Sequence, residues 1–446
     1  MMRALTAFLS ALIVVAGAPA GAADLLEIYR AAQSADAVYA GARATWAAGQ
    51  EKIPQGRAGL LPSVTLSAST QHNDRDLRFR DATVPGLSGP FNSNALTLSL
   101  TQPLFRRQNA VVYEQAKSQV TQADAVFALA AQDLLLRTAQ AYFDVLLAQN
   151  TVELSAAQIV AIGQQLEQAK RNFEVGTATI TDTHDAQARY DLTVSTEIAA
   201  KNDLEVKKRA LAQIIGRPAP PLLTVGPKLT LLEPQPNNME AWVTEALDSN
   251  LDIQVSRAAL EFSTQEVERN RAAHLPTLDA FATYTDTGTG AGATNALGID
   301  STNKIIGLQL AVPIYQGGLV TSRVREALAN QEKSRQDLEN ARRSADFSAR
   351  QAFLGVTSGI AQVKALGAAL VSSQSSLDST RLGQEVGVRT QVDVLNAQQL
   401  LFQTRRDRAQ AVYNYLLSLL KLKAAVGKLA EEDLAGVNAW LDRPIP

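Results

Sequence analysis

The chain has 446 residues, of which 46% are hydrophobic and 19% charged, and its formal net charge is −2. This balance argues against a nucleic-acid-binding protein, which would carry a basic surplus. The absence of cysteine excludes disulfides, thiolate metal sites and a cysteine-linked lipid anchor. Aromatic residues make up only 5%, and Ala and Gln are abundant, which is typical of long packed helices.

The N-terminal residues 1–22 have the pattern of a secretory signal peptide. Arg3 supplies the positive start, residues 5–16 the apolar run, and residues 20–22 the small-residue cleavage site. A membrane anchor is the alternative, but the run is too short and lacks a stop-transfer flank. We expect cleavage after Ala22 and a mature protein outside the cytoplasm. No later run approaches about 18 consecutive apolar residues, so membrane contact would require β-strands or a surface helix.

The chain contains an internal duplication. Gly176 and Gly387 lie 211 residues apart, and Asp182 and Asp393 have the same separation. Each glycine follows a valine and precedes a segment of helical character, so one turn occurs twice. The duplication predicts a first repeat, a Pro-rich connector that excludes a continuous helix, and a second repeat, at 23–216, 217–238 and 239–446.

Each repeat contains two stretches in which apolar and polar residues alternate, as in strands with one apolar face. The predicted strands are 63–72 and 95–102 in the first repeat, and 277–285 and 305–312 in the second. Polar loops are expected between them, at 73–94 and 286–304. Hairpins on a soluble sheet and strands of a transmembrane barrel both fit this alternation. Four strands cannot close a barrel of useful size, and open edges are forbidden in lipid, so a barrel would require several chains to pool their strands.

Long spans without proline follow the strands and predict two long helices, at 103–175 and 313–386. Each begins at a proline, which suits the first helical turn, and each would be roughly 110 Å long at about 1.5 Å per residue. Tip turns are expected at 175–181 and 386–392, where glycine ends one helix and a return helix of half the length begins. In each repeat, the helix before the first strand would stack end to end on the return helix, so that the two half-length helices together match the long one. The predicted fold class is therefore mostly α-helical, a long coiled-coil assembly joined to a membrane β-barrel.

Several strings, spread along nearly all of the mature chain, are specific when taken together: LLPSVTLSA, LTQPLF, AYFDVLLA, FEVGTATITD, HLPTLDA, LAVPIYQGG and VGVRTQVDVL. Through them the chain resembles the TolC family of outer-membrane efflux proteins. The resemblance implies a homotrimer whose pooled strands form a twelve-stranded barrel in the outer membrane of a Gram-negative cell, above a helical tunnel through the periplasm. It also implies a passive exit duct for efflux or type I secretion, docked onto a periplasmic adaptor protein and a proton-driven or ATP-driven inner-membrane transporter.

The resemblance implies that the helical tips form a closable entrance. Arg389 would bond to Asp182, and Asp393 would surround the narrowest opening and attract cations. The chain departs from the family at Gln384, where a tyrosine of the closing network is expected, and at Asn396, where a second ring aspartate is expected. We therefore expect fewer closing links and weaker divalent-cation binding. The tip residues that would face the adaptor are Val175, Gly176, Thr177, Val386, Gly387 and Val388.

Two interpretations of the tip acids stay open. Three copies of Asp393 around an axis would raise the pKa of at least one of them and favour a bound cation. Alternatively, Asp182 and Asp393 are simply helix N-terminal residues favoured by the macrodipole. The sequence offers no motif for an enzyme or a cofactor, and its histidines lack metal-ligand spacing. The alternative function left by the residues is a periplasmic coiled-coil scaffold or adaptor without a barrel.

Overall fold

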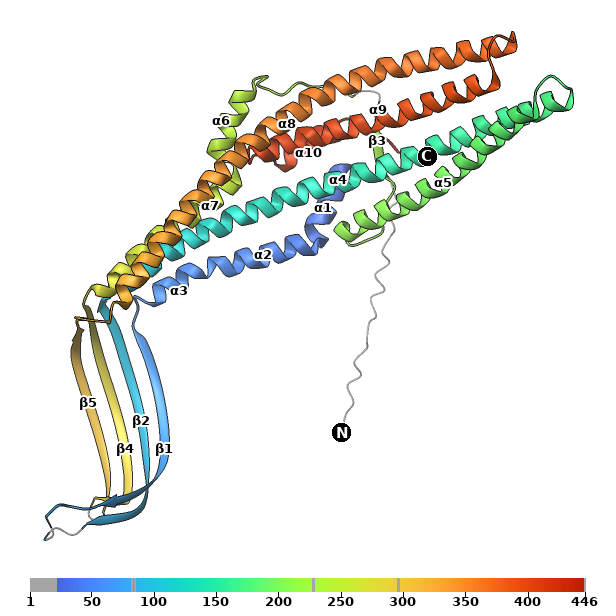
Figure 1. Cartoon of the computed structure of the whole chain (residues 1–446). Helices are drawn as coiled ribbons and strands as arrows, with labels where there is room; N and C mark the ends of the chain where they lie inside the picture. Colours follow the sequence, from blue (N-terminus) through green and yellow to red (C-terminus); the bar gives the residue numbers. More distant parts are fainter. Residues whose placement is uncertain (1–21, 82, 84–85, 227–228, 295–296, 445–446) are drawn as a thin grey trace, which may run out of the picture. The chain divides into compact units, whose positions relative to one another are not determined.

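The computed structural model describes residues 22–81, 83, 86–226, 229–294 and 297–444. The predicted signal peptide therefore lies outside the described residues, except for Ala22. The chain forms two compact units that alternate along the sequence (Figure 1). The helical unit comprises Met1–Gly41, Ala130–Asp248 and Asp346–Pro446, and the strand-bearing unit comprises Ala42–Leu129 and Ser249–Ala345.

The strand-bearing unit contains one antiparallel sheet in the order β1-β2-β4-β5 (Figure 1). Its strands are β1 (Ser63–Leu77), β2 (Leu87–Phe105), β4 (Thr277–Thr294) and β5 (Leu297–Ala311). They are longer than the alternation predicted, because the polar segments expected as loops continue the pairing. Asp74 pairs with Pro90, and Asp286 pairs with Thr302. Backbone groups need partners whether or not side chains alternate, so a polar sequence can extend a ladder.

The apolar residues of neighbouring strands share one face of this sheet. Leu66 lies opposite Leu98, and Leu98 lies opposite Tyr284. Large side chains on this face are exposed within the single chain, Leu66 to 66% and Ile306 to 89%. In the described sheet, β1 and β5 each pair on one side only. The sheet therefore presents an apolar face and two open edges, which a single chain does not cover.

The two long helices are α4 (Arg107–Glu174) and α8 (Leu319–Glu385), of 68 and 67 residues. Both begin later than predicted. Pro103 belongs to strand β2, and α8 starts after Gly317 and Gly318, whose φ angles of 62° and 81° are left-handed. Windows in both helices are apolar enough to cross a membrane by composition alone. This is weak evidence for a span, because core helices of soluble proteins meet the same criterion.

The return helices are α5 (Ile180–Ile215) and α9 (Gln391–Ala425). The segment before the first strand of each repeat, expected as one helix, is divided. In the first repeat it forms α1 (Leu25–Ala35), α2 (Ala37–Gln50) and α3 (Lys52–Ala58), and in the second α6 (Met239–Ser249), α7 (Leu251–Arg271) and the 3-10 turn η1 (Ala272–His274). Asp36 and Asn250 mark the first division of each segment, and their side chains accept hydrogen bonds from the backbone that follows. Asp and Asn favour such caps over helix interiors.

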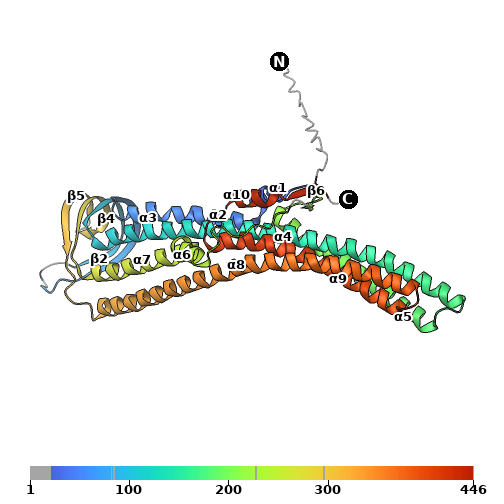
Figure 2. The same cartoon turned by 90° about the horizontal axis from the view of Figure 1, so that it is seen from above.

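Within the helical unit, the connector is fixed to the helices by two buried tyrosines. Tyr142 of α4 donates to the Leu223 carbonyl at 2.7 Å, and Tyr415 of α9 bonds to both backbone groups of Leu232. The short strand β3 (Leu223–Val225) pairs with β6 (Leu441–Pro444) near the C-terminus. Figure 2 shows β6 beside α1 and α10 (Glu431–Asn438). The connector and the segment near the C-terminus therefore meet on one side of the helical unit.

Candidate entrance site at the helical tips

The first tip turn reverses the chain between α4 and α5. Gly176 has a φ of 77°, a left-handed value that glycine adopts without strain. Its N–H donates to the Phe173 carbonyl at 3.0 Å. The N–H groups of Thr177 and Ala178 both donate to the Asn172 carbonyl, at 2.8 and 3.2 Å. The turn thus satisfies carbonyls that the end of α4 would otherwise leave unpaired.

The second tip turn, between α8 and α9, repeats this geometry. Gly387 has a φ of 80°, and its N–H donates to the Gln384 carbonyl at 3.0 Å. The N–H groups of Val388 and Arg389 both donate to the Gly383 carbonyl, at 2.8 and 3.0 Å. The sequence duplication therefore encodes two copies of one hydrogen-bonded turn.

Both tip acids belong to capping boxes at the start of a return helix. Asp182 accepts from the Thr179 N–H and hydroxyl through Oδ2, at 3.0 and 2.8 Å. Asp393 accepts from the Thr390 N–H and hydroxyl through Oδ2, both at 2.9 Å. Within the described part of the single chain, neither acid forms an ion pair with Arg389. The closing contact between Asp182 and Arg389 stays a prediction about the assembled protein.

The electrostatic surroundings of Asp393 keep it ionised. The Thr390 N–H, then the Thr390 hydroxyl, and then the charge of Arg389 lower the pKa of the Asp393 carboxyl below its ordinary value. Among the residues that the structure describes, no group of three or more His, Asp or Glu side chains could hold a metal ion. A cation ring would therefore depend on Asp393 from several copies of the chain, which stays a prediction.

Gln384, at the position of the expected tyrosine, takes part in a bridge between the two helical hairpins, α4–α5 and α8–α9. Its Nε2 donates to Oε1 of Gln391 at the start of α9. Gln391 is only 8% exposed, and its Nε2 donates to Oε1 of Gln165 on α4 at 2.7 Å. Three amides thus connect α8, α9 and α4. Sequence reasoning identified Gln384 but not its partners, which lie on other helices.

Asn396, at the position of the expected second ring acid, is also engaged. Its Oδ1 accepts from Nη2 of Arg189 on α5 at 2.7 Å. Nη1 of the same Arg189 donates to Oε1 of Gln399 at 2.9 Å. Arg189 was not predicted, because its partners lie more than 200 residues away and only the packing of α5 on α9 brings them together.

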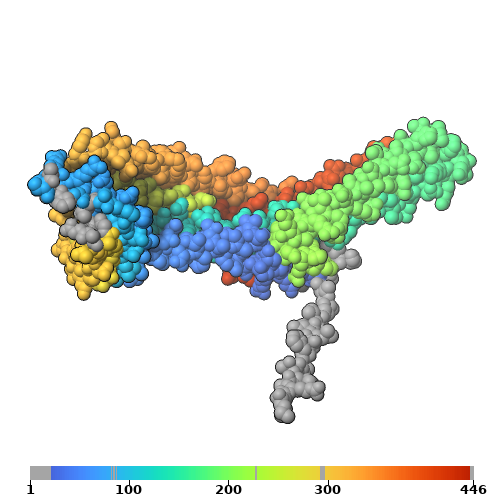
Figure 3. All heavy atoms as spheres, turned by 90° about the horizontal axis from the view of Figure 1, so that it is seen from below, coloured from blue at the N-terminus to red at the C-terminus, as the bar shows by residue number. Residues whose placement is uncertain are grey.

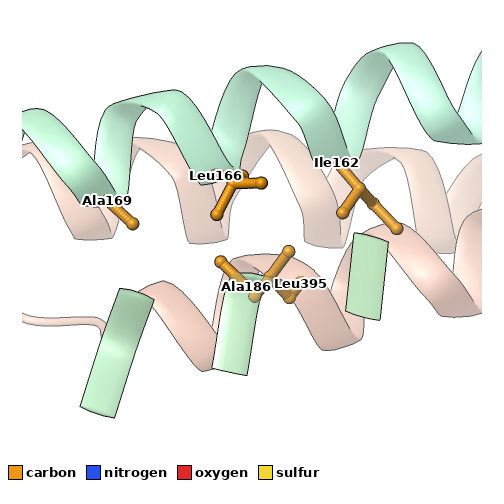
Figure 4. Packing of buried hydrophobic residues seen from close by; sticks show 5 residues of the cluster. All are labelled: Ile162, Leu166, Ala169, Ala186 and Leu395. Carbon is orange, nitrogen blue, oxygen red and sulfur yellow. The ribbon is translucent and has the colours of Figure 1, made fainter. Parts of the chain in front are cut away.

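A small apolar cluster joins α4, α5 and α9 (Figure 4). Ile162, Leu166 and Ala169 of α4 pack with Ala186 of α5 and Leu395 of α9. Each of them is at most 5% exposed. Because side chains from both hairpins share this cluster, the hairpins form one packed body close to their tips.

The outermost tip residues are apolar and exposed. Val175, Val386 and Val388 are 73%, 66% and 75% exposed. The end of the first hairpin, drawn in green, lies at the surface in Figure 3. Exposed apolar patches are typical of surfaces that bind another protein.

A family model described as outer membrane efflux protein matches residues 28–217 and 242–428, which cover most of both repeats. The chain belongs to the outer membrane efflux protein family. Among relatives, it is 34% identical to outer membrane protein TolC of Vibrio cholerae over 99% of both chains. It is 31% identical to alkaline protease secretion protein AprF of Pseudomonas aeruginosa, over 98% of this chain and 92% of the relative.

Solved structures of outer-membrane proteins have the same fold. The crystal structure of VceC from Vibrio cholerae superposes with a TM-score of 0.77 at 19% identity, and covers 90% of this chain and 96% of its own. The Campylobacter jejuni CmeC outer membrane channel gives 0.79 at 17% identity, over 94% and 90%. The predicted fold class, outer-membrane location and exit-duct function are therefore confirmed for this family member. The family assignment decides against a scaffold without a barrel, and the relatives are channels rather than enzymes.

Proposed function

We propose that three copies of this chain assemble into one duct, in which twelve pooled strands close a barrel through the outer membrane. The observation that carries the proposal is the four-stranded sheet with an exposed apolar face and with pairing on one side only at β1 and β5. Unpaired backbone groups are not tolerated in lipid. Pairing β5 of one copy with β1 of the next removes both edges and turns the apolar face toward lipid.

We further propose that the tips receive a periplasmic adaptor, which connects the duct to an inner-membrane transporter. The exposed valines of both tips support this, since they offer an apolar surface at the end of each hairpin. Among the relatives, TolC is named as an outer membrane protein and AprF for alkaline protease secretion. The family description as an efflux protein and the naming of AprF for secretion support a proposed cargo of exported molecules and secreted proteins, moved by a proton-driven or an ATP-driven partner.

The entrance at the tips would be closed by contacts between copies as well as within each copy. Asp182 and Asp393 use Oδ2 for their capping bonds, and under this proposal Oδ1 of each would accept a bond from a neighbouring copy or a cation. Arg389 is exposed and within electrostatic reach of Asp393. A bond from Arg389 of one copy to Asp182 of the next would hold the tips together, and a ring of Asp393 would attract cations.

Single-channel conductance of the purified full-length protein in a planar bilayer tests this proposal. We expect a small conductance that increases in Arg389→Ser. A large conductance that Arg389→Ser leaves unchanged would keep the duct but reject the closing role of Arg389. Folded protein that forms no channel, and no heat-modifiable trimer on gels, would contradict the proposed assembly.

A further inference from the structure

Gly383 lies in the last turn of α8, directly against the side chain of Arg389. A Cβ placed on Gly383 would lie 2.7 Å from Cγ of Arg389 and 3.4 Å from its Cβ. It would also lie 3.5 Å from Cγ2 of Val388. Carbon atoms in ordinary contact are about 3.5–4.0 Å apart, so the first distance is too short. The aliphatic part of Arg389 therefore occupies the space that a side chain at 383 would need.

The backbone gives no other reason for glycine at this position. Gly383 lies within the last turn of α8 and has no positive φ, in contrast to Gly387, whose positive φ favours a residue without a side chain. Glycine inside a helix is less favourable than alanine. Glycine at 383 is unfavourable for the helix, but it leaves the space in which the side chain of Arg389 lies against the helix.

The first tip provides an internal comparison. The Asn172 and Gly383 carbonyls each accept the two corresponding N–H groups of their turns, so the two backbones match. At the first tip the residues in these places are Asn172 and Ala178, whereas at the second they are Gly383 and Arg389. The larger residue of the pair is on the helix at the first tip and on the turn at the second. Of the two matched turn positions, 178 and 389, only the second therefore carries a long cation, and it lies against the end of its outgoing helix.

We propose that Gly383 is a positioning residue for the entrance, which holds the stem of Arg389 so that its guanidinium is presented outward to a neighbouring copy. The inference rests on the proposed closing role of Arg389. A long side chain loses rotamer freedom when it forms a contact, and a side chain that is already held loses less. Alanine at 383 would displace the stem, so the closing contact would form less often although Arg389 is still present.

A double-mutant cycle on the full-length trimer tests the proposal, with single-channel conductance as the readout. The variants are Gly383→Ala, Arg389→Ala and both together, and Gly367→Ala is the matched control. Gly367 lies on the same helix, and a Cβ there would meet nothing within 4 Å. We expect Gly383→Ala to raise the open fraction about fivefold or more, the usual effect of one lost interaction on an equilibrium. We expect no such rise in Gly367→Ala, and no further rise when Gly383→Ala is added to Arg389→Ala.

Thermal unfolding separates positioning from damage to the fold. Because alanine favours helix, neither Gly383→Ala nor Gly367→Ala should lower the Tm. Wild-type conductance in Gly383→Ala, or additive effects in the double variant, would overturn the proposal while the duct stands. Arg389→Ala that conducts like the wild type would overturn both the closing role and this inference. Folded trimers that do not conduct in any of these variants would overturn the proposed duct itself, together with the inference that rests on it.

Discussion

The guanidinium of Arg189 on α5 donates a 2.7 Å hydrogen bond to the side-chain oxygen of Asn396 on α9. This contact joins the first hairpin to the second within one chain, close to the tips. It also gives Asn396 a role that differs from that of an acid facing the opening. We therefore expect closure of the proposed entrance to depend on contacts inside each copy as well as on contacts between copies.

Replacement of Arg189 tests this in-chain contribution. Arg189→Gln removes the bonds to Asn396 and Gln399, which at an exposed site are worth about 1 kcal/mol. We expect the open fraction in planar bilayers to rise about fivefold. Lys208→Gln is the control, because the ion pair of Lys208 is with Glu205 on the same helix, at 3.2 Å. Equal conductance of the two variants would contradict the role of Arg189.

Restoring an acid at position 396 should strengthen both closure and cation binding. Asn396→Asp keeps an oxygen for Arg189 and turns the existing hydrogen bond into one between opposite charges, which is stronger. Three copies would also add negative charge around the axis. We expect the divalent-cation concentration that half-blocks the channel to fall by roughly tenfold, which corresponds to about 1.4 kcal/mol. Asn202→Asp on α5 adds the same charge at another exposed position, and an equal effect there would show that only net charge matters.

The parts of the site that could be predicted from the sequence are those encoded locally. Gly176 and Gly387 lie at left-handed turn positions, and Asp182 and Asp393 each follow a threonine by three residues, so a short string fixes each turn and cap. The partners of Arg189 could not be predicted. They depend on which faces of α5 and α9 meet, and no pattern within either helix records that.

The fold shows the same limit. Proline-free spans and alternation predicted the order of helices and strands, because each reflects the period of one element. The ends of the strands were underestimated, since the pairing of Asp74 with Pro90 depends on the partner strand rather than on alternation. The division of the first helical segment at Asp36 was missed because a cap such as the one Asp36 forms on the Tyr39 N–H is only one of the roles that an aspartate takes in a helical pattern.

The charge at Asp393 should persist well into the acid range. Hydrogen bonds from Thr390 and the charge of Arg389 lower its pKa below the ordinary value of 3.8. A carboxylate with a lowered pKa stabilises the fold above its ordinary pKa, and this stabilisation is lost as the pH falls through the lowered value. We expect the Tm difference between the wild type and Asp393→Asn to be constant from pH 5 to 8, and to shrink only below about pH 4. A midpoint above pH 5 would show that neighbouring copies raise the pKa, as repulsion among three carboxylates predicts.

Asp36 should contribute to stability through its partners in the helical unit. It is 5% exposed, accepts the Tyr39 N–H at 2.7 Å, and receives two 3.2 Å bonds from Arg137. Burial alone would raise the pKa of Asp36, but these donors outweigh it and lower the pKa. Asp36→Ala removes the cap and leaves a partly buried guanidinium with fewer acceptors. We expect a loss of about 2 kcal/mol, seen as a lower Tm in thermal unfolding of the trimer.

Asp133 provides the matched control for that substitution, because it pairs with the same Arg137 at 2.6 Å but its side chain is 55% exposed. An exposed pair four residues apart on a helix is worth about 0.3–0.5 kcal/mol, so Asp133→Ala should lower the Tm far less. Similar losses in both variants would mean that the charge of Arg137, rather than the buried cap at Asp36, determines the stability here. Because the stabilisation comes from a carboxylate with a lowered pKa, the difference between the variants should also disappear at pH values below the ordinary range of aspartate.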